Sequence, residues 1–270
     1  MSTHALAAWL RCPNCCSPLT EFGPLVLGCN EDHRFDVNRR GYLTLLPSNV
    51  HLIGDDESML DHRSAALDGG AYAPISAALG REAPAEARWI LDAGCGTGHY
   101  LRQLLADRPD ARGLAMDLSP TAVRRAVRGN PRVDGLVADT WSPLSIRDGR
   151  CDVVLNVFAP RNLPEFHRVL RPGGTLLVVV PDAEHLAQLR TATAMLDIPS
   201  QKADRVAEQA SPLFTIENVE RVRYELPLDA SLAHHLAAMG PSAHHGASTP
   251  PAAVPDTVTV AVDVLSFLRP

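Results

Sequence analysis

The sequence predicts an α/β fold in which a doubly wound, mostly parallel sheet follows a small metal-stapled module. A buried strand near residue 90 runs straight into a glycine-rich turn and a helix, and acidic residues then close two further predicted strands. Two cysteine- and histidine-bearing knuckles within the first 33 residues predict the module. With 270 residues and 46% hydrophobic content, the chain can bury a full core.

The glycine turn is the centre of the predicted sheet. Residues 89–91 form a short apolar run typical of a buried strand, and three glycines at every second position, Gly94 to Gly98, then turn the chain tightly enough for a ligand to touch its backbone. A helix is predicted over about 100–106. A dinucleotide-binding fingerprint has the spacing G-x-G-x-x-G, whereas this stretch has G-x-G-x-G with Asp92 two residues before the first glycine.

This form of the turn resembles motif I of class I S-adenosylmethionine (SAM) methyltransferases. The resemblance implies that the loop wraps the amino-acid end of SAM and that Asp92 interacts with the ammonium group of SAM. The second predicted strand, 112–116, ends in Asp117, whose two oxygens are placed to hold two ribose hydroxyls. The third, 135–138, ends in Asp139, which in these enzymes lies beside the adenine. The expected cofactor-binding set is Asp92, Gly94, Gly96, Thr97, Gly98, His99, Tyr100, Asp117, Leu118, Asp139, Thr140 and Asn156.

An ordinary α/β domain with structural glycines and helix-capping aspartates is the alternative. Three acids at three successive strand ends fit a cofactor site better than that reading.

The N-terminal module carries the ligand spacing of a structural zinc site. Cys12 and Cys15 form a C-x2-C knuckle, thirteen residues intervene, and Cys29 and His33 form a C-x3-H knuckle. Cys16 could replace Cys15 as a ligand, although the spacing favours Cys15. Free or disulfide-bonded cysteines are the alternative, and the remaining cysteines, Cys95 and Cys151, lie too far along the chain to complete an even disulfide framework.

The boundaries predicted from the sequence divide the chain into three parts. Residues 1–47 form the zinc-binding Cys3His module, with a hairpin over 19–27, and Pro47 ends it. Residues 48–88 form a helical connector with one helix over 58–67 and another that begins at 75–79. Residues 89–270 form the methyltransferase domain.

Further elements of the methyltransferase domain follow from apolar patterning. Helices are predicted over 165–170, 183–196 and 232–239, and no assignable signal is found over 199–212. Residues 239–245 are expected to form a loop over the active site. Strands are predicted over 151–156, 175–180, 214–226, with a bend near Asn218, and 257–268.

Motifs spread over nearly the whole chain resemble those of the RlmA/TlrB family of large-subunit ribosomal RNA guanine-N1 methyltransferases. The family pattern is found in F-D-x-x-x-x-G-Y-x-x-L-L (35–46), D-x-x-M-x-x-x-R (56–63), G-x-Y-x-P (70–74) and the segments 155–162, 170–176 and 239–242. The resemblance implies a seven-stranded Rossmann-like sheet, SAM as cofactor, structural Zn²⁺ and a guanine in a domain II hairpin of 23S ribosomal RNA as substrate. It also implies a possible homodimer. The segments 156–162 and 239–242 are closest to the branch associated with resistance to tylosin-type macrolides.

Three side chains are the candidates for chemistry on the base. Asn156 offers an amide donor and acceptor to a nucleobase, and Phe158 can stack on it, a core aromatic being the alternative. Guanine N1 must lose its proton, and His245 is the candidate general base, with an exposed loop residue as the alternative. Backbone groups near Ala159 and hydrogen bonds from Asn156 could instead stabilise the deprotonated ring. His244 and His245 stand where family members usually carry a tryptophan, which puts stacking by that residue in doubt.

Charge bears on the choice of substrate. The formal net charge of −6 lowers the expectation of a large nucleic-acid footprint, although Arg34, Arg39 and Arg40 are natural phosphate contacts or else solvated surface charges. Arg161 is either a further phosphate contact or a surface charge at a helix start. A methyltransferase acting on a small natural product or protein is therefore the first alternative function, and a zinc-bearing binding protein with a degenerate cofactor fold is the second.

Targeting signals are missing from the sequence. No apolar run approaches the roughly 20 residues that span a bilayer. The first ten residues lack the basic segment of a signal peptide. We therefore expect a cytoplasmic protein with no membrane partner.

Overall fold

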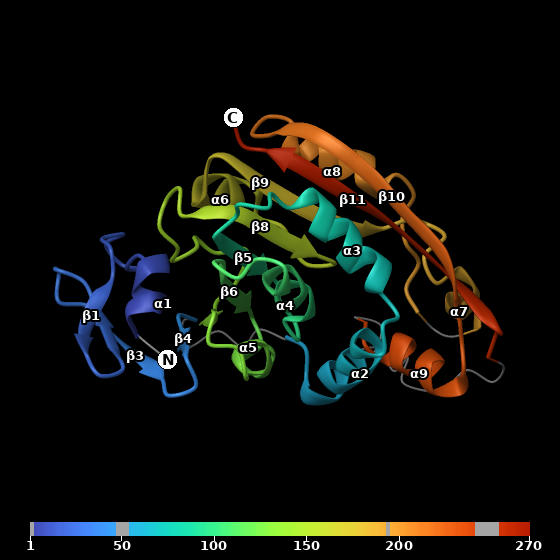
Figure 1. The fold of residues 1–270 in the computed structure, drawn as a ribbon, viewed down its shortest axis with the longest axis horizontal. Coiled ribbons are helices and arrows are strands. Elements are labelled where there is room, and N and C mark those ends of the chain that lie inside the picture. The colour runs from blue at the N-terminus through green and yellow to red at the C-terminus, as the bar shows by residue number, and fades with distance from the viewer. Residues whose placement is uncertain (1–2, 47–53, 193–194, 241–253) are drawn as a thin grey trace.

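The structure is a computed structural model that describes residues 3–46, 54–192, 195–240 and 254–270 (Figure 1). In this part of the chain eleven strands form one mixed sheet in the order β1-β2-β3-β4-β7-β6-β5-β8-β9-β11-β10. The strands are β1 (Thr20–Gly23), β2 (Val26–Gly28), β3 (Arg34–Asn38), β4 (Tyr42–Thr44), β5 (Trp89–Ala93), β6 (Arg112–Asp117), β7 (Val133–Val137), β8 (Cys151–Val157), β9 (Leu170–Pro181), β10 (Thr215–Pro227) and β11 (Thr257–Leu268). The helices are α1 (Thr3–Trp9), α2 (Glu57–Asp68), α3 (Ala73–Glu82), α4 (His99–Ala106), α5 (Pro120–Val127), α6 (Leu163–Val169), α7 (Ala187–Ala192), α8 (Lys202–Ala210) and α9 (Ala230–Ala238).

Strands β5 to β11 form the predicted seven-stranded, doubly wound sheet. From β5 the chain winds outward through β6 and β7, and it then returns to the other side of β5 with β8 and β9, all in parallel pairs. Strand β11 inserts antiparallel between β9 and β10. The winding direction reverses between β5 and β8, and ligands of such sheets bind at the carboxyl ends of the strands beside this switch point.

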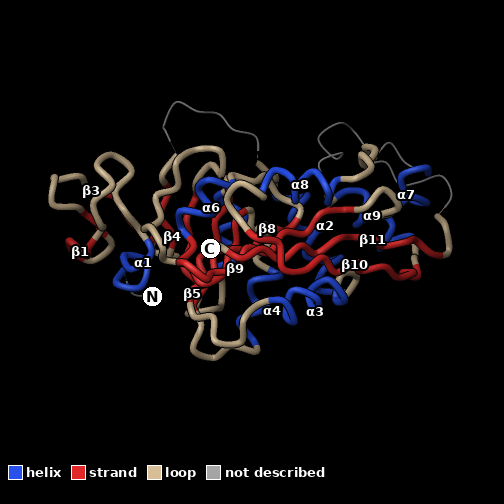
Figure 2. Tube along the Cα trace, turned by 90° about the horizontal axis from the view of Figure 1, so that it is seen from above, coloured by secondary structure: helices blue, strands red, loops and turns tan. Residues whose placement is uncertain are grey.

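Helices cover both faces of the sheet. Figure 2 shows α6 and α8 on one side and α3 and α4 on the other. The buried residues fall into two clusters, one per face, which include Phe166 of α6 and Leu101 of α4. Near-continuous burial along β8 and β9 matches strands that are covered on both faces. Strand β10, by contrast, is the outer edge, and most of its residues are exposed.

The sheet continues without interruption into the zinc module. Strand β4 pairs in parallel with β7, Tyr42 lying opposite Gly135, and β3 pairs with β4. The side chain of Tyr42 and helix α5 meet at Gly135, where an added Cβ would lie 2.6 Å from both Tyr42 Cβ and Val123 Cγ1. A glycine is therefore required at this junction.

Helix α1 and the loop before β8 lock the module onto the sheet. Trp9 is fully buried, donates its indole N–H to Asp134 Oδ2 at 3.1 Å and packs edge-on against Trp89. Arg147 donates to the backbone carbonyl oxygens of Ala7, Leu10 and Leu19, at 2.7–2.9 Å. These contacts satisfy the guanidinium group and tie both ends of the first knuckle to one side chain.

Most predicted elements are confirmed to within two residues. The helix over 58–67 is α2, whose N-cap Asp56 accepts a hydrogen bond from the Met59 N–H at 2.8 Å. The bend near Asn218 is a register shift between Ile216 and Asn218 in β10. Within the described ranges, no helix combines the length and apolar character that a membrane span requires.

The segment between β9 and β10 differs from the prediction. The helix expected over 183–196 is reduced to α7, because the chain makes a turn with Leu186 at φ 54° before it, and residues 193–194 lie outside the described range. Over 199–212, where no signal was found, the chain forms α8. That helix buries Val206 and Ala210 and packs Ala203 and Ala207 against the same core, a spacing of i, i+3, i+4 and i+7. The period is helical, but three of the four residues are alanines and the apolar face is small.

Replacing Trp9 with alanine tests the locking of the module. Trp9→Ala should lower the free energy of unfolding by about 3–5 kcal/mol, because it empties a large buried site and leaves Asp134 without its indole donor. Trp141→Ala is the matched control, since the Trp141 side chain is 67% exposed, and it should change stability by about 0.5 kcal/mol at most. Urea denaturation of both variants followed by circular dichroism would measure the difference, and equal costs would contradict the proposed lock.

Candidate functional site

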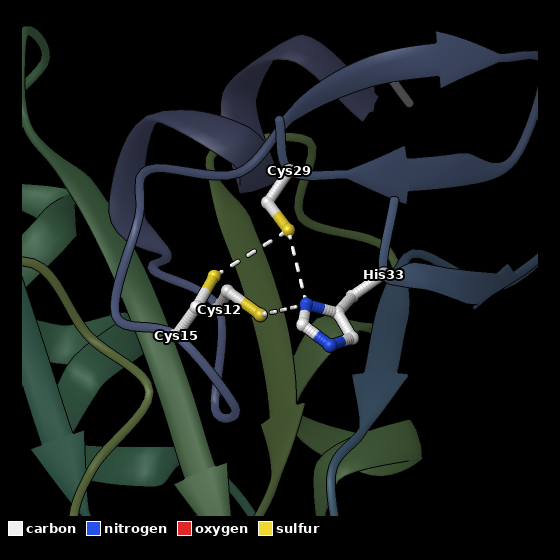
Figure 3. A group of neighbouring side chains, drawn as sticks. All are labelled: Cys12, Cys15, Cys29 and His33. Atoms are coloured by element: carbon white, nitrogen blue, oxygen red, sulfur yellow. Dashed lines mark hydrogen bonds between the residues drawn. The ribbon is translucent and has the colours of Figure 1, made fainter. Parts of the chain in front are cut away.

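Four side chains from the two knuckles converge on one point. The ligand atoms of Cys12, Cys15, Cys29 and His33 all lie within 4.8 Å of one another, and Figure 3 shows them turned toward a common centre. Cys29 Sγ lies 3.3 Å from His33 Nδ1 and 3.6 Å from Cys15 Sγ. A zinc tetrahedron with Zn–S bonds of about 2.3 Å has edges of about 3.8 Å, so this group has the size and chemistry of a closed structural zinc site.

The geometry decides between the two neighbouring cysteines. Cys16 is exposed and lies in the left-handed region at φ 61°, whereas Cys15 belongs to the converging group. Hydrogen bonds from the side chain and backbone of Ser17 lower the pKa of the Cys15 thiol to about 6, which favours the thiolate that zinc binds. The prediction of Cys15 as the ligand is therefore supported by the structure.

The glycine turn folds as its spacing predicts. Gly94 and Gly98 have φ values of 87° and 75°, which disfavour any residue with a side chain. An added Cβ at Gly94 would lie 2.4 Å from Ala159 Cβ, and at Gly98 2.6 Å from Ala126 Cβ. The loop that follows β8 and carries Ala159, and helix α5, therefore both approach this turn closely.

Asp92 is buried at the carboxyl edge of the sheet without a partner. The residue is 1% exposed, and its Oδ2 accepts no hydrogen bond. Burial, with a smaller contribution from the Asp117 charge, raises the pKa of the Asp92 carboxyl to about 7. A buried acid without a donor is costly, and a ligand with a cationic amino group would remove that cost.

Two further buried oxygens without partners lie near Asp92. They are the hydroxyl of Tyr100, in the first turn of α4, and Oδ1 of Asn156, on β8. In the described part of the chain these three are the buried side-chain oxygen atoms that lack a hydrogen bond. All three belong to residues around the switch point of β5 and β8, where the open sheet predicts a ligand.

Asp117 and Asp139 follow the next two strands. Asp117 accepts hydrogen bonds from the backbone N–H groups of Gly96 and Ser119, both at 2.9 Å, and burial raises the pKa of its carboxyl. Asp139 lies two residues beyond the end of β7 and accepts from the Trp141 N–H and the Ser142 hydroxyl. Asp117 is thus oriented toward the glycine turn, while Asp139 caps its own turn.

The remaining expected cofactor residues surround the same turn. His99 is buried, with Nδ1 3.5 Å from Asp68 Oδ1 and Nε2 3.4 Å from Ser76 Oγ, so it links α4 to α2 and α3. The Thr97 carbonyl accepts a hydrogen bond from Arg102 at 2.6 Å. Leu118 directly follows β6, and Thr140 is buried and accepts from the Asn162 amide at 2.9 Å. Their contacts with a cofactor stay predictions.

Asn156 shapes the loop that follows β8. Its amide nitrogen donates to the carbonyl oxygens of Ala93, at 3.2 Å, and Pro160, at 2.8 Å. Both amide hydrogens are thereby used, and the buried Oδ1 is the group left to accept from a ligand. Asn156 was also expected to donate a hydrogen bond to a nucleobase, but in this arrangement its amide has no free hydrogen left to donate.

Phe158 is not a core aromatic. It is 40% exposed and lies in the left-handed region at φ 53°, a conformation that the Asn156 contacts hold in place. Its ring stacks on His185, with centroids 5.8 Å apart, and lies 6.1 Å from the Tyr72 ring. A planar base could therefore meet an aromatic face at this edge.

Tyr72 and His185 were not predicted as site residues. His185 Nδ1 accepts from the Ala261 N–H at 3.3 Å, so the neutral ring carries its hydrogen on Nε2, 3.2 Å from the Tyr72 hydroxyl. Burial lowers the pKa of His185 to about 4, which keeps it neutral. Tyr72 stands in the G-x-Y-x-P motif, whereas nothing local to His185 indicates that it would lie against a residue 113 positions away.

Arg63 connects the connector helix to the glycine turn. It forms an ion pair with Asp55 and donates to the Met239 carbonyl at 2.7 Å, and its Nη1 would lie 2.9 Å from a Cβ at Gly96. The D-x-x-M-x-x-x-R motif thus places its arginine beside the cofactor loop. The predicted general base His245 lies outside the described residues.

Comparisons with known proteins agree with this arrangement. The family described as "RlmA, N-terminal" matches residues 10–51, and a methyltransferase domain family matches residues 90–174. A 23S rRNA (guanine(748)-N(1))-methyltransferase of Streptomyces fradiae is 46% identical over 88% of this chain and 86% of the relative. A protein of Micromonospora griseorubida, named as a candidate 23S rRNA (guanine-N(1)-)-methyltransferase, is 40% identical over 96% of both chains.

A solved structure supports the fold alone. A methyltransferase solved in complex with the Haloferax volcanii Trm112 activator matches with a TM-score of 0.57 and 18% identity, over 81% of this chain and all of that chain. The predictions of an α/β methyltransferase fold, a SAM cofactor and a structural zinc site are confirmed by these matches together with the four-ligand group.

Serine substitutions separate the two neighbouring cysteines. Cys15→Ser should lose bound zinc, because it removes one of four converging ligands, while Cys16→Ser should keep about one zinc per chain. Zinc content measured by atomic emission after dialysis would compare the two. Equal loss in both variants, or loss in Cys16→Ser alone, would contradict the assignment.

Proposed function

Because the chain belongs to the family of 23S ribosomal RNA guanine-N1-methyltransferases, we propose that it transfers a methyl group from SAM to N1 of a guanine in 23S ribosomal RNA. The observation that carries the proposal is the set of three unpaired buried oxygens, of Asp92, Tyr100 and Asn156, around the glycine turn. An adenosyl amino acid has the charge and the donors that these oxygens lack. That the methyl acceptor is a guanine of 23S ribosomal RNA is inferred from the names of the relatives.

The proposed binding of SAM follows from the same residues. Asp92 pairs with the ammonium group, the glycine turn admits the amino-acid end, and Asp117 holds the ribose. Leu118, Asp139 and Thr140 lie along the path proposed for the adenine. SAM supplies an activated methyl group, so the chain has chiefly to hold the guanine in line with it and to allow the N1 proton to leave.

The proposed handling of the base uses loop 156–161. Phe158 presents an exposed aromatic face for stacking, and Asn156 holds the loop through its amide hydrogen bonds to the carbonyl oxygens of Ala93 and Pro160. His185 is a poor base, because its pKa is about 4 and its Nδ1 already accepts from Ala261. We propose His245 as the general base that removes the N1 proton. A base of this kind works only when it is unprotonated, so kcat should fall on the acid side of the pH profile, and His245→Gln should lose that acid-side dependence.

The proposal extends to the partners of the enzyme. N1 lies on the base-pairing edge, so the guanine must be unpaired or flipped, which suits a hairpin of domain II. We propose that the chain divides into three parts, with boundaries at residues 47 and 88, and that it acts in the cytoplasm. The resemblance to the family also suggests a homodimer, which sedimentation at micromolar protein concentration would test. Drug resistance is part of the proposal, and unchanged macrolide susceptibility of a sensitive host that gains the gene would remove it.

Reverse transcription tests the reaction and the substrate together. Unmodified 23S ribosomal RNA incubated with the protein and SAM should acquire a strong stop one nucleotide before the modified guanine, because an N1-methyl group blocks base pairing. The name of the Streptomyces fradiae relative nominates guanine 748 as the position to examine. Reactions without SAM, and RNA with adenine at that position, are the controls.

A protein that binds SAM but produces no stop would lose the proposed substrate. A methyltransferase acting on a small molecule or a protein would then be the better explanation.

The raised pKa of Asp92 predicts a pH dependence of SAM binding. The ammonium group pairs with the ionised carboxylate, so SAM affinity should fall as the pH drops through about 7, by up to about tenfold per pH unit. Asp92→Asn should bind SAM weakly at all pH values and lose this dependence between about pH 5.5 and 7. Calorimetry would measure both proteins, with the exposed Asp110→Asn as control, and a wild-type affinity independent of pH would contradict the proposed role.

A further inference from the structure

A basic hollow lies between the zinc module and the glycine turn, and of the residues expected to bind SAM it includes Thr97. Its volume is about 840 Å³, and its walls come from the β3–β4 turn, α2, the start of α4 and α5. Figure 1 shows β4, α5 and α2 along the same edge of the molecule. The hollow therefore borders both the module and the catalytic domain.

The lining of this hollow is charged opposite to the protein as a whole. Six arginines and two carboxylates line it, a formal excess of four positive charges on a chain of formal charge −6. The arginines are Arg39, Arg40, Arg102, Arg124, Arg125 and Arg128. Segregation of this kind marks a binding surface for an anion.

The two carboxylates do not neutralise the whole set. Glu57 lies 3.5 Å from Arg124, and Asp61 lies 2.7 Å from Arg125. Arg39, Arg40 and Arg128 are exposed, and none of the three forms an ion pair with any residue in the described ranges. Two of these unpaired cations come from the zinc module and one from the catalytic domain.

The strand pairing fixes these arginines relative to one another. Arg39 and Arg40 directly precede Gly41 and β4, which pairs with β7, and Gly135 of β7 lets Tyr42 and α5 approach closely. The chain carries Arg128 at the C-terminal end of that same helix. The strand pairing therefore holds the arginines of the zinc module at a fixed place relative to Arg128 of the catalytic domain.

We propose that the sugar-phosphate backbone of the substrate RNA lies in this hollow and contacts Arg39, Arg40 and Arg128. The inference rests on the proposed function and adds to it the surface that holds the RNA. A single phosphate would need converging donors, whereas cations spread over two modules suit successive phosphates of a strand. Thr97 of the glycine turn lines the hollow as well, so the hollow leads toward the cofactor loop.

Charge removal at the three unpaired arginines tests the proposal. The variant Arg39→Gln/Arg40→Gln/Arg128→Gln should bind unmodified domain II RNA more weakly, and the slope of log affinity against log salt should fall by about 2–3, about 0.7–0.9 for each lost contact. The KM for RNA should rise while kcat at saturating RNA and the affinity for SAM stay unchanged. Replacement of the same three residues with lysine should keep most of the slope, since a point charge still meets each phosphate.

The control is Arg205→Gln, which removes an exposed arginine from α8, away from the hollow, and should leave the slope unchanged. The single variant Arg128→Gln also removes one charge, so it is the direct comparison for Arg205→Gln. A wild-type protein that methylates the RNA, with a glutamine variant of unchanged slope, would overturn the inference and leave the proposed function intact. A wild-type protein that neither binds nor methylates the RNA would instead overturn both.

Discussion

The parallel pairing of β4 with β7 is the constraint on which the rest of the structure depends. It joins residues about ninety positions apart, so it is a long-range contact whose loop must close before the pair can form. In return it makes the zinc module part of the sheet, and Trp9 and Arg147 hold its other side. The module therefore presents its surface to substrate as a rigid extension of the enzyme.

Sequence alone predicted those parts whose signals are local. Glycines at alternate positions and cysteines at fixed spacing leave few conformations open, and the turn and the zinc group have the predicted form. What it did not predict depends on contacts between distant segments. Arg147 has the sequence context of a surface arginine and is instead surrounded by carbonyl oxygens of the module, and His185 becomes a site residue only through Tyr72 and Phe158. Helix α8 has helical spacing of its apolar residues, but most of them are alanines, which give a weak signal in the sequence.

Two buried charged side chains, Arg108 and Asp92, differ in whether their burial is compensated. Arg108 is 7% exposed and donates to the carbonyl oxygens of Gly80, Ala83, Pro84 and Leu104, so its burial is fully compensated. Asp92 is 1% exposed and receives no hydrogen bond at Oδ2. The free protein therefore carries an electrostatic cost at the switch point of the sheet, and the same cost becomes affinity when a cationic ligand arrives.

The two edges of the sheet are protected in different ways. Strand β10 lies open at one end with charged side chains along an exposed row, which discourages pairing with a second chain. On the other side of the catalytic sheet β7, whose residues are all buried, pairs with β4, and without the module its backbone groups on that side would be free. The folded zinc module thus also covers the backbone groups along one side of β7. If loss of zinc unfolds the module, the backbone groups of β7 become free to pair with a strand of another chain.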